Sequence, residues 1–259
     1  MSKVRSALFY LKRPSYWAHL QQRAIKPFLP NLDSRDLQQL ASEWARTHAR
    51  PLTVALTQCG LLPSADAEMP RMEMDVLHAA KMRAEQCHYH MGGPGYIDLI
   101  YAATRLTRAA AAVETGVAYG WSSLAFLTAM QPFGGKLVSV DRPYPGVGND
   151  PFVGIVVPLD LRANWTIVRE PDRNGLRRAL ASFPEGVDIV HYDSDKSYRG
   201  RRFGYSMLWN ALRPGGVFLS DDVQDNMAFA HFVEEKDVIF SVTATRGKYA
   251  GIAIKPRLC

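Results

Sequence analysis

The sequence predicts an α/β fold in which helices flank a doubly wound, mostly parallel sheet. Two observations lead to this prediction. From Ala109 onward, apolar runs of strand length alternate with helical segments, which is the pattern of parallel strands joined by helical crossovers. Acidic residues stand repeatedly where these runs end, and ligands of parallel sheets bind at the carboxyl ends of the strands. The chain is therefore expected to contain one ligand-binding α/β domain.

The sheet is expected to have seven strands, mostly with helical segments between them. Only residues 244–248, which include Gly247, separate the last two apolar runs. These two strands should therefore pair as an antiparallel hairpin at one edge of the sheet. The predicted strands are residues 110–114, 136–141, 165–168, 187–193, 216–221, 238–243 and 249–254.

Residues 1–95 precede this alternation and predict a helical N-terminal extension that prolines interrupt. Two segments in it, residues 37–45 after Asp33-Ser34 and residues 72–86, have the apolar spacing of amphipathic helices. Neither helix carries reactive side chains on its surface. We interpret the extension as a lid, a substrate-selecting cap or a contact between copies of the chain, and we expect the α/β domain to span residues 96–259.

Composition limits the classes of protein to consider. With 259 residues, of which 47% are hydrophobic, the chain can bury a sizeable core. It has neither an apolar run long enough to cross a bilayer nor a signal-peptide pattern, so we expect a cytoplasmic protein. Three scattered cysteines indicate neither a disulfide framework nor a zinc site. The formal net charge of +6 suggests an anionic partner, although a solvated basic surface explains it more simply.

The stretch from Val113 to Ser123 predicts a strand, a tight turn and the start of a helix. Glycine in the turn would let a ligand approach the main chain, and the helix would present unpaired N–H groups. The carboxylate of Glu114, just before the turn, would repel a pyrophosphate but accept a cationic or hydroxyl-rich ligand. An ordinary strand-to-helix turn is the alternative. The candidate ligand-binding residues are Glu114, Gly116, Ala118, Gly120, Ser122 and Ser123, the two serines also being candidate helix caps.

Acidic residues follow four of the predicted strands. Asp141 ends the second strand, where an acid can accept hydrogen bonds from a ribose diol. Asp193, Asp221 and Asp222 end neighbouring strands, and carboxylates packed together repel each other unless a proton or a cation lies between them. Three carboxylates suit Mg²⁺, Ca²⁺ or Mn²⁺. Alternatively, Asp221 and Asp222 only cap the next helix.

From about Ala109 to its end, the chain resembles class I S-adenosylmethionine-dependent methyltransferases, which implies their Rossmann-like fold. Glu114-Thr115-Gly116, followed by Gly120-Trp121-Ser122-Ser123, resembles the cofactor loop of the cation-dependent O-methyltransferases. The sequences Asp193 to Tyr198, Leu212 to Gly216 and Asp221-Asp222 also recur in that group in this order. Several motifs in the right order are more specific than any single one.

Two branches of that group compete, and they assign different bases. In the catechol and caffeoyl-CoA type, the match of Lys196 to Asp-x-x-Lys implies that this lysine is the base, although Asp222 replaces an asparagine. The macrocin-type sugar methyltransferases have Asp-x-Asp and then Asp-Asp, which Asp193, Asp195, Asp221 and Asp222 match. That resemblance implies that Asp195 is the general base and that the other three acids are metal ligands. The acids favour the sugar or natural-product branch.

The expected function is therefore S-adenosylmethionine-dependent, divalent-metal-dependent methylation of a hydroxyl on a sugar or natural product, with Mg²⁺ as the expected ion. The cofactor would lie over the turn from Gly116 to Gly120, with its ribose on Asp141 and its cationic amino-acid end near Glu114. We expect a hydroxylated small molecule as the partner, no nucleic acid, and a homo-oligomer contact through the N-terminal region. Aromatic residues such as Tyr89, Tyr96 and Trp121 could stack on the acceptor or belong to the core.

Two alternatives remain. The positive charge favours a metal-independent methyltransferase that acts on nitrogen or RNA. The sequence Asp193-Ser194-Asp195-Lys196 argues against it, because such enzymes commonly have Asn/Asp-Pro-Pro-aromatic at this place. A non-catalytic scaffold of the same fold is the second alternative, and the presence of all the expected acids argues against that.

Overall fold

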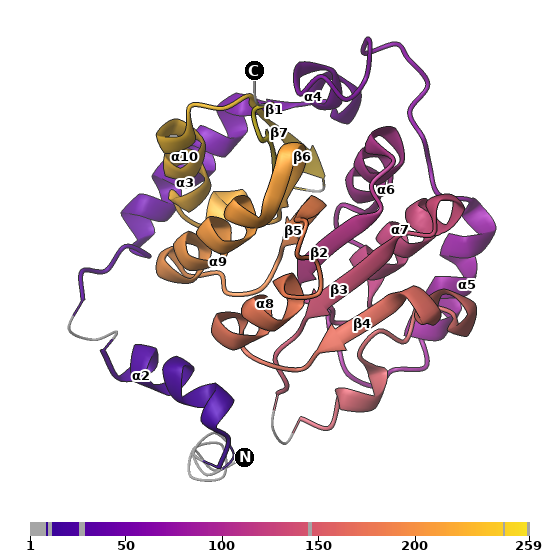
Figure 1. Ribbon diagram of the computed structural model, residues 1–259. Helices are drawn as coiled ribbons and strands as arrows, with labels where there is room; N and C mark the ends of the chain where they lie inside the picture. The colour runs from indigo at the N-terminus through magenta and orange to yellow at the C-terminus, as the bar shows by residue number, and fades with distance from the viewer. Residues whose placement is uncertain (1–8, 10–11, 26–28, 145–146, 246, 258–259) are drawn as a thin grey trace.

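One mixed sheet of eight strands organises the computed structural model, which describes residues 9, 12–25, 29–144, 147–245 and 247–257 (Figure 1). The strand order is β1-β7-β8-β6-β5-β2-β3-β4. Neighbouring strands pair in parallel, except that β8 runs antiparallel to both β6 and β7. The strands are β1 (Ala49–Arg50), β2 (Ala111–Thr115), β3 (Lys136–Val140), β4 (Trp165–Val168), β5 (Val187–Tyr192), β6 (Leu212–Ser220), β7 (Phe240–Thr245) and β8 (Lys248–Ile254). The predicted mostly parallel α/β fold is confirmed.

All seven predicted strands are present, and the predicted antiparallel hairpin is the pair β7 and β8. The hairpin is not the outermost element of the described sheet, however, because β1 pairs in parallel with β7 through Ala49 and Val242. This eighth strand was not predicted. It has two residues, which is too short for the apolar alternation that identifies a strand in a sequence.

Helices cover both faces of the sheet and form two hydrophobic clusters. Alternation along β2 shows the division, because Ala112 belongs to one cluster and its neighbours Ala111 and Val113 belong to the other. The cluster around Ala112 includes residues of α4 (Leu52–Gln58), α5 (Met74–Ala84), α6 (Ile97–Thr107) and α7 (Trp121–Met130). The opposite cluster includes residues of α3 (Arg35–His48), α8 (Asp172–Leu180), α9 (Tyr198–Ala211) and α10 (Ala228–Lys236).

The remaining helical elements are short or peripheral. Helix α2 (Trp17–Ile25) precedes α3 in the N-terminal extension. Turns of 3₁₀ helix lie at Pro14–Tyr16, Gln131–Phe133, Asp150–Phe152, Leu159–Asn164 and Val223–Asp225. Within the described ranges, no helix combines the length and the apolar character that a bilayer crossing needs.

The N-terminal extension packs directly on the sheet. Ser34 caps α3 by accepting a hydrogen bond from the backbone N–H of Leu37, as the sequence predicts. The half-buried indole of Trp44 then stacks on Phe240 of β7, with 5.7 Å between ring centroids, and meets the edge of Phe229 of α10 at 6.1 Å. The domain boundary at residue 95 stays a prediction, but α3, β1 and α4 all contribute to the packing around β7.

Replacing Trp44 tests how far the extension stabilises the domain. Trp44→Ala removes the contacts with Phe240 and Phe229 and leaves a cavity, so we expect the free energy of unfolding to fall by about 2–4 kcal/mol in a denaturant titration. Leu40→Ala is the matched control on the same helix. The Leu40 side chain is 55% exposed, and its loss should change the free energy by less than about 0.5 kcal/mol. Equal effects of the two changes would contradict the packing role of α3.

Candidate active site

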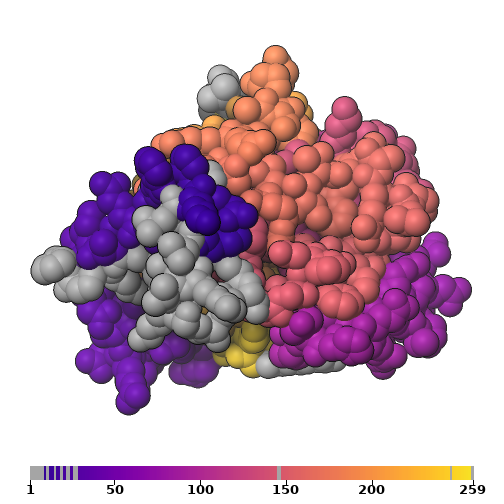
Figure 2. Space-filling view, turned by 90° about the horizontal axis from the view of Figure 1, so that it is seen from below, coloured from indigo at the N-terminus to yellow at the C-terminus, as the bar shows by residue number. Residues whose placement is uncertain are grey.

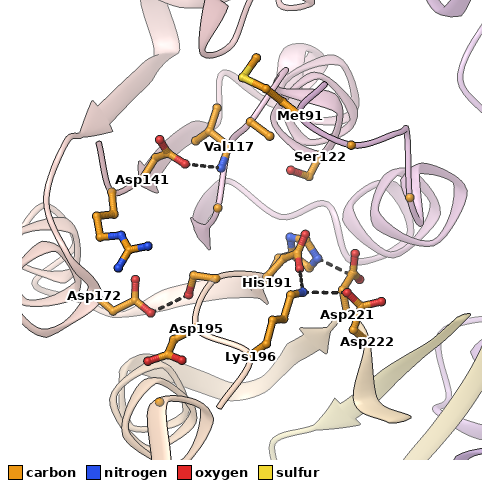
Figure 3. Close-up of a pocket in the computed structure, with 18 of the residues that line it drawn as sticks. Met91, Val117, Ser122, Asp141, Asp172, His191, Asp195, Lys196, Asp221 and Asp222 are labelled. Atoms are coloured by element: carbon orange, nitrogen blue, oxygen red, sulfur yellow. Dashed lines mark hydrogen bonds and ion pairs between the residues drawn. The ribbon is translucent and has the colours of Figure 1, made fainter. Parts of the chain in front are cut away.

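A cavity of about 1710 Å³ opens at the carboxyl ends of the central strands (Figure 3). Its walls include the segments that follow β2, β3, β4, β5 and β6, together with residues 29–33 and 89–98. The strand order reverses at β2, which has β3 on one side and β5 on the other. A reversal of this kind is where open α/β sheets bind ligands. Figure 2 shows the N-terminal segment, in indigo, along one side of the molecule.

The turn after β2 presents its backbone to the cavity. Gly116, Ala118 and Gly120 all have positive φ angles, of 82°, 47° and 91°. A Cβ atom at Gly116 would collide with the carbonyl oxygen of Asp193, so only glycine fits where the turn crosses the end of β5. Ala118 adopts a left-handed conformation that is uncommon for residues with a side chain. The cavity is lined by Gly116, Val117, Ala118, Trp121 and Ser122 of this segment.

Three of the predicted ligand-binding residues lie behind this turn. Glu114 is fully buried, and its Oε1 accepts hydrogen bonds from Ser123 and, at 2.6 Å, from Ser139. Burial raises the pKa of the Glu114 carboxyl, and the serine hydrogen bonds only partly oppose this. Gly120 rather than either serine is the N-cap of α7, and it packs against Gly154. Glu114 is not among the residues that line the cavity, and the described residues offer its Oε2 no hydrogen-bond partner, so the expected contact with a cationic ligand stays a prediction.

Asp141 stands at the end of β3, on the cavity wall. Its Oδ1 accepts a hydrogen bond from the backbone N–H of Val117 at 3.0 Å, and its Oδ2 pairs with Arg169. Arg169 also pairs with Asp150. The acid thus braces the turn after β2 while its carboxylate borders the cavity, as Figure 3 shows. Arg169 was missed from the sequence, where it is one basic residue after the fourth strand.

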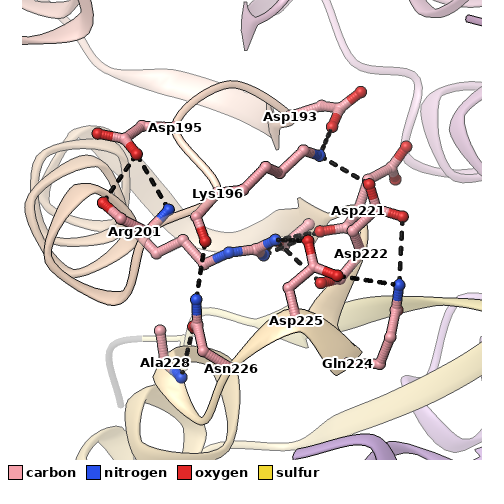
Figure 4. Close-up of polar contacts among 12 residues, drawn as sticks. Asp193, Asp195, Lys196, Arg201, Asp221, Asp222, Gln224, Asp225, Asn226 and Ala228 are labelled. Carbon is pink, nitrogen blue, oxygen red and sulfur yellow. Dashed lines mark hydrogen bonds and ion pairs between the residues drawn. The ribbon is translucent and has the colours of Figure 1, made fainter. Parts of the chain in front are cut away.

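The three acids predicted to share a cation follow β5 and β6. Tyr192 and Ser220 are register partners at the ends of these strands, so Asp193 and Asp221 leave the sheet side by side. Lys196 lies between two of the acids: its Nζ pairs with Asp193 and lies 2.8 Å from Oδ2 of Asp222 (Figure 4). The other oxygen of Asp222 is 3.4 Å from Lys248 Nζ, and Asp221 Oδ1 is 3.1 Å from His191 Nε2. We call Asp193, Lys196, Asp221 and Asp222 the acid cluster.

The charges of the acid cluster shift each other's pKa values. Burial and the nearby charge of Asp221 raise the pKa of Asp193, although Lys196 opposes the shift. Burial alone would lower the pKa of Lys196, but the carboxylates of Asp193 and Asp222 outweigh it and raise that pKa. Burial alone would raise the pKa of Asp222, but the contact with Lys196 more than offsets this effect, so the pKa of Asp222 falls. The lysine is therefore held as an ammonium ion.

A divalent cation at the acid cluster can be tested against these side chains. Among the residues placed in this structure, no three His, Cys, Asp or Glu side chains gather closely enough to hold a metal ion as they stand. Lys196 is the cation that Asp193 and Asp222 share. The donor set nevertheless consists of carboxylate oxygens, which Mg²⁺ prefers. The chemistry of the residues fits a divalent cation, provided that Lys196 gives up its place between the two acids.

Asp195 is separated from the acid cluster. Its Oδ1 accepts hydrogen bonds from the backbone N–H and the hydroxyl of Ser197, at 3.0 and 2.8 Å. It packs so closely on Gly200 that a Cβ atom there would collide with the Asp195 carboxylate. Asp195 borders the cavity, but Figure 3 shows it turned away from Lys196. Of the two predicted bases, only Lys196 therefore lies among the acids.

Arg201 holds the turn that carries Asp221 and Asp222. Its side chain is only 1% exposed, and its two terminal nitrogens donate to the carbonyl oxygens of Asp221 and Asp222, each at 2.9 Å. Asp222 has a φ angle of 53°, so the fork of the guanidinium stabilises a backbone turn that is unfavourable for a residue with a side chain. Sequence reasoning missed Arg201. Its spacing with the buried Tyr205 and Leu208 on one face of α9 is the signal that could have revealed it.

Comparison with known proteins agrees with this geometry. Residues 113–223 match a family model described as a methyltransferase domain, a span that begins within β2 and ends just after Asp221 and Asp222. No curated protein sequence matches the chain.

Similar folds are found among solved structures. The O-methyltransferase from Bacillus cereus, in complex with SAH, has a TM-score of 0.57 and 14% identity, and the match covers 82% of this chain and 100% of that chain. The O-methyltransferase TomG from Streptomyces achromogenes, in complex with SAM, has a TM-score of 0.52 and 16% identity, and the match covers 82% of this chain and 98% of that chain. The SAH-bound methyltransferase PaMTH1 from Podospora anserina has a TM-score of 0.54 and 10% identity, and the match covers 88% of this chain and 98% of that chain. The predicted Rossmann-like methyltransferase fold is confirmed.

Replacing Arg201 and, as a control, its neighbour Arg202 tests whether Arg201 stabilises the turn at Asp221 and Asp222. Arg201→Met removes a buried guanidinium that donates to both carbonyls and pairs with Asp225, so we expect the free energy of unfolding to fall by about 3–5 kcal/mol. Arg202 makes an exposed ion pair with Glu235, and Arg202→Met should cost less than about 1 kcal/mol. Denaturant titration of both variants measures the difference, and similar losses would argue against a special role for Arg201.

Proposed function

We propose that this chain, which carries a methyltransferase domain on the class I methyltransferase fold, transfers a methyl group from S-adenosylmethionine to a hydroxyl oxygen of a small molecule. One observation supports this above the others. The turn after β2, which suits the methyl donor, and the acid cluster, which suits a hydroxylated acceptor, border the same cavity. Methyl transfer requires both molecules to be aligned in one space, with the acceptor oxygen in line with the sulfonium.

The turn and Asp141 support the position of the donor. Gly116, Val117 and Ala118 expose main chain on which the cofactor can lie, and Asp141 has a carboxylate at the place where a ribose diol is usually bound. SAM or SAH is bound in the TomG and Bacillus proteins of similar fold. We propose the same donor here, over the turn and beside Ser122, with Glu114 supporting the turn from behind through Ser123.

The acid cluster supports the use of a divalent cation, with Mg²⁺ as our candidate. Asp193, Asp221 and Asp222 would hold the ion through carboxylate oxygens. When bound, such an ion lowers the pKa of a coordinated hydroxyl and so makes it easier to deprotonate. The closeness of the acids supports this proposal, because burial and the neighbouring charge of Asp221 keep the pKa of Asp193 raised even with Lys196 alongside.

Lys196 is the better placed of the two candidate bases. Asp195 already accepts two hydrogen bonds from Ser197 at the start of α9. Lys196 reaches the acids, but as an ammonium ion it has no lone pair with which to accept a proton. In this state it orients an acceptor oxygen by donating a hydrogen bond. The charges of Asp193 and Asp222 raise the pKa of Lys196. Lys196 can therefore act as a base only after these two acids bind another cation in its place.

The acceptor is proposed to be a hydroxylated sugar or natural product. A cavity of about 1710 Å³ exceeds the roughly 300–1,000 Å³ that one drug-sized ligand usually occupies, so it has room for a donor and an acceptor together. TomG, which has a similar fold, is involved in tomaymycin synthesis. Assembly through the N-terminal extension stays a prediction.

A metal-independent O-methyltransferase is the second candidate, and the position of Lys196 favours it. The ammonium group pairs with Asp193 and Asp222, where it supplies part of the positive charge that a metal ion would bring. Under this alternative Lys196 would stay between the two acids throughout the reaction and hold the acceptor oxygen by hydrogen bonding.

Chelation separates the two candidates. We expect the purified protein to bind SAH in calorimetry and to transfer a radiolabelled methyl group from SAM to members of a panel of glycosides and phenols. Activity should fall at least tenfold in EDTA and return with Mg²⁺, because the acids would then lose and regain their ion. Activity that persists in EDTA but disappears in Lys196→Met would favour the metal-independent candidate. Absence of SAH binding would contradict both.

Separate replacement of the two candidate bases tests their roles. Lys196→Ala should lower kcat by about 10²-fold or more, the usual size of a general acid–base contribution. Asp195→Ala should instead lower the free energy of unfolding by about 1 kcal/mol, because it removes a hydrogen-bond acceptor from the start of α9, and should change kcat by less than tenfold. Kinetics and thermal unfolding of both variants measure this. If Asp195→Ala instead lowered kcat by about 10²-fold while Lys196→Ala changed it by less than tenfold, Asp195 would be the better candidate for the base.

A further inference from the structure

The hydroxyl of Tyr96 is a buried polar group with no hydrogen-bond partner among the described residues. Tyr96 is the N-cap residue of α6, and its side chain is packed so closely that the residue is 5% exposed. It follows Gly95, whose φ angle is 59°. A buried hydroxyl without a partner is unfavourable, and such groups usually find one in a folded protein. The described part of the chain therefore leaves a donor beside the cavity for which a bound molecule could supply the acceptor.

The surroundings of Tyr96 indicate where that partner belongs. Tyr96 borders the same cavity as the acid cluster. The backbone passes directly over one of the acids, since a Cβ atom at Gly95 would lie 3.6 Å from Oδ2 of Asp221. After burial, the charges of Asp221, Asp222 and Asp193 are the main causes that raise the pKa of Tyr96. The hydroxyl therefore stays protonated and able to donate, close to the carboxylates without being bonded to them.

The backbone before Tyr96 leaves room for adjustment. Gly92 and Gly93 have no atoms near the positions where their Cβ atoms would lie, and Gly92 has a φ angle of 103°. The main chain that leads to Tyr96 is therefore loosely packed at these two glycines.

On the basis of the proposed function, we propose that Tyr96 is a ligand-binding residue whose hydroxyl donates a hydrogen bond to an oxygen that enters the acid cluster. That oxygen is either a hydroxyl of the acceptor or a water carried by a divalent cation. Each has a lone pair that can accept a hydrogen bond from the Tyr96 hydroxyl beside Asp221. Either would give that hydroxyl the partner that the described residues do not supply. Tyr96 would then help to fix the orientation of the acceptor for in-line transfer.

The variant Tyr96→Phe keeps the ring and removes only the hydroxyl. Because the described residues offer the hydroxyl no partner, the midpoint of thermal unfolding should be unchanged or higher. Thr128→Val is the matched control: the Thr128 hydroxyl is also buried without a partner, but α7 holds it away from the cavity walls. A lower midpoint in Tyr96→Phe would mean that the protein itself pairs this hydroxyl, and would overturn the inference.

Ligand titrations complete the test and distinguish the two sources of the oxygen. Mg²⁺ alone and, in the presence of SAH, 1,2-dihydroxybenzene are titrated into wild type, Tyr96→Phe and Thr128→Val by calorimetry. We expect Tyr96→Phe to bind at least one probe fivefold or more weakly: the Mg²⁺ arm would identify a cation-borne water and the dihydroxybenzene arm an acceptor hydroxyl. Thr128→Val should bind like wild type.

Equal affinities of wild type and Tyr96→Phe in both arms would overturn the inference, as would wild-type protein that binds SAH but neither probe. In both cases the donor half of the proposed function would stand. Failure of wild-type protein to bind SAH would instead contradict the proposed function itself.

Discussion

Repulsion among carboxylates at the ends of β5 and β6 is the constraint to which the rest of the site responds. Parallel pairing brings Asp193 beside Asp221, and Asp222 follows directly in the chain. Charges so close and partly buried must be balanced. Lys196, Lys248 and His191 each approach one or more of these acids, so the protein carries its own counter-charges. These contacts offset part of the repulsion between the carboxylates.

Buried polar side chains, rather than apolar packing, fix the backbone of the site. Arg201 donates to the two carbonyls of the turn at Asp221 and Asp222. Asp141 accepts from the N–H of Val117, and Arg169 in turn holds Asp141. The carboxylate of Glu114 ties the helix after the turn to β3 through two serines. Each of these side chains hydrogen-bonds a polar group of a neighbouring segment, and together these bonds hold the main chain that faces the cavity.

The sequence allowed the sheet and the chemical character of the site to be predicted, because both depend on local pattern. Apolar runs identified seven strands, and the acids at their ends identified the edge where β5 and β6 place Asp193 and Asp222. Side-chain direction was not predictable in the same way. Glu114 and Asp195 have the expected types at the expected places, yet one turns toward Ser139 and the other toward Ser197. Such choices depend on tertiary neighbours that no spacing in the chain reveals.

The pairing of β1 with β7 joins segments from opposite ends of the chain. During synthesis Ala49 leaves the ribosome long before Val242, so β1 must wait, unpaired, until the C-terminal hairpin has been made. The two-residue length of β1 limits the edge that it exposes during this wait. Helix α3, which is made early, therefore docks on a strand that is made late. A ribosome-bound nascent chain lacking β7 would leave Trp44 of α3 without Phe240 to stack on.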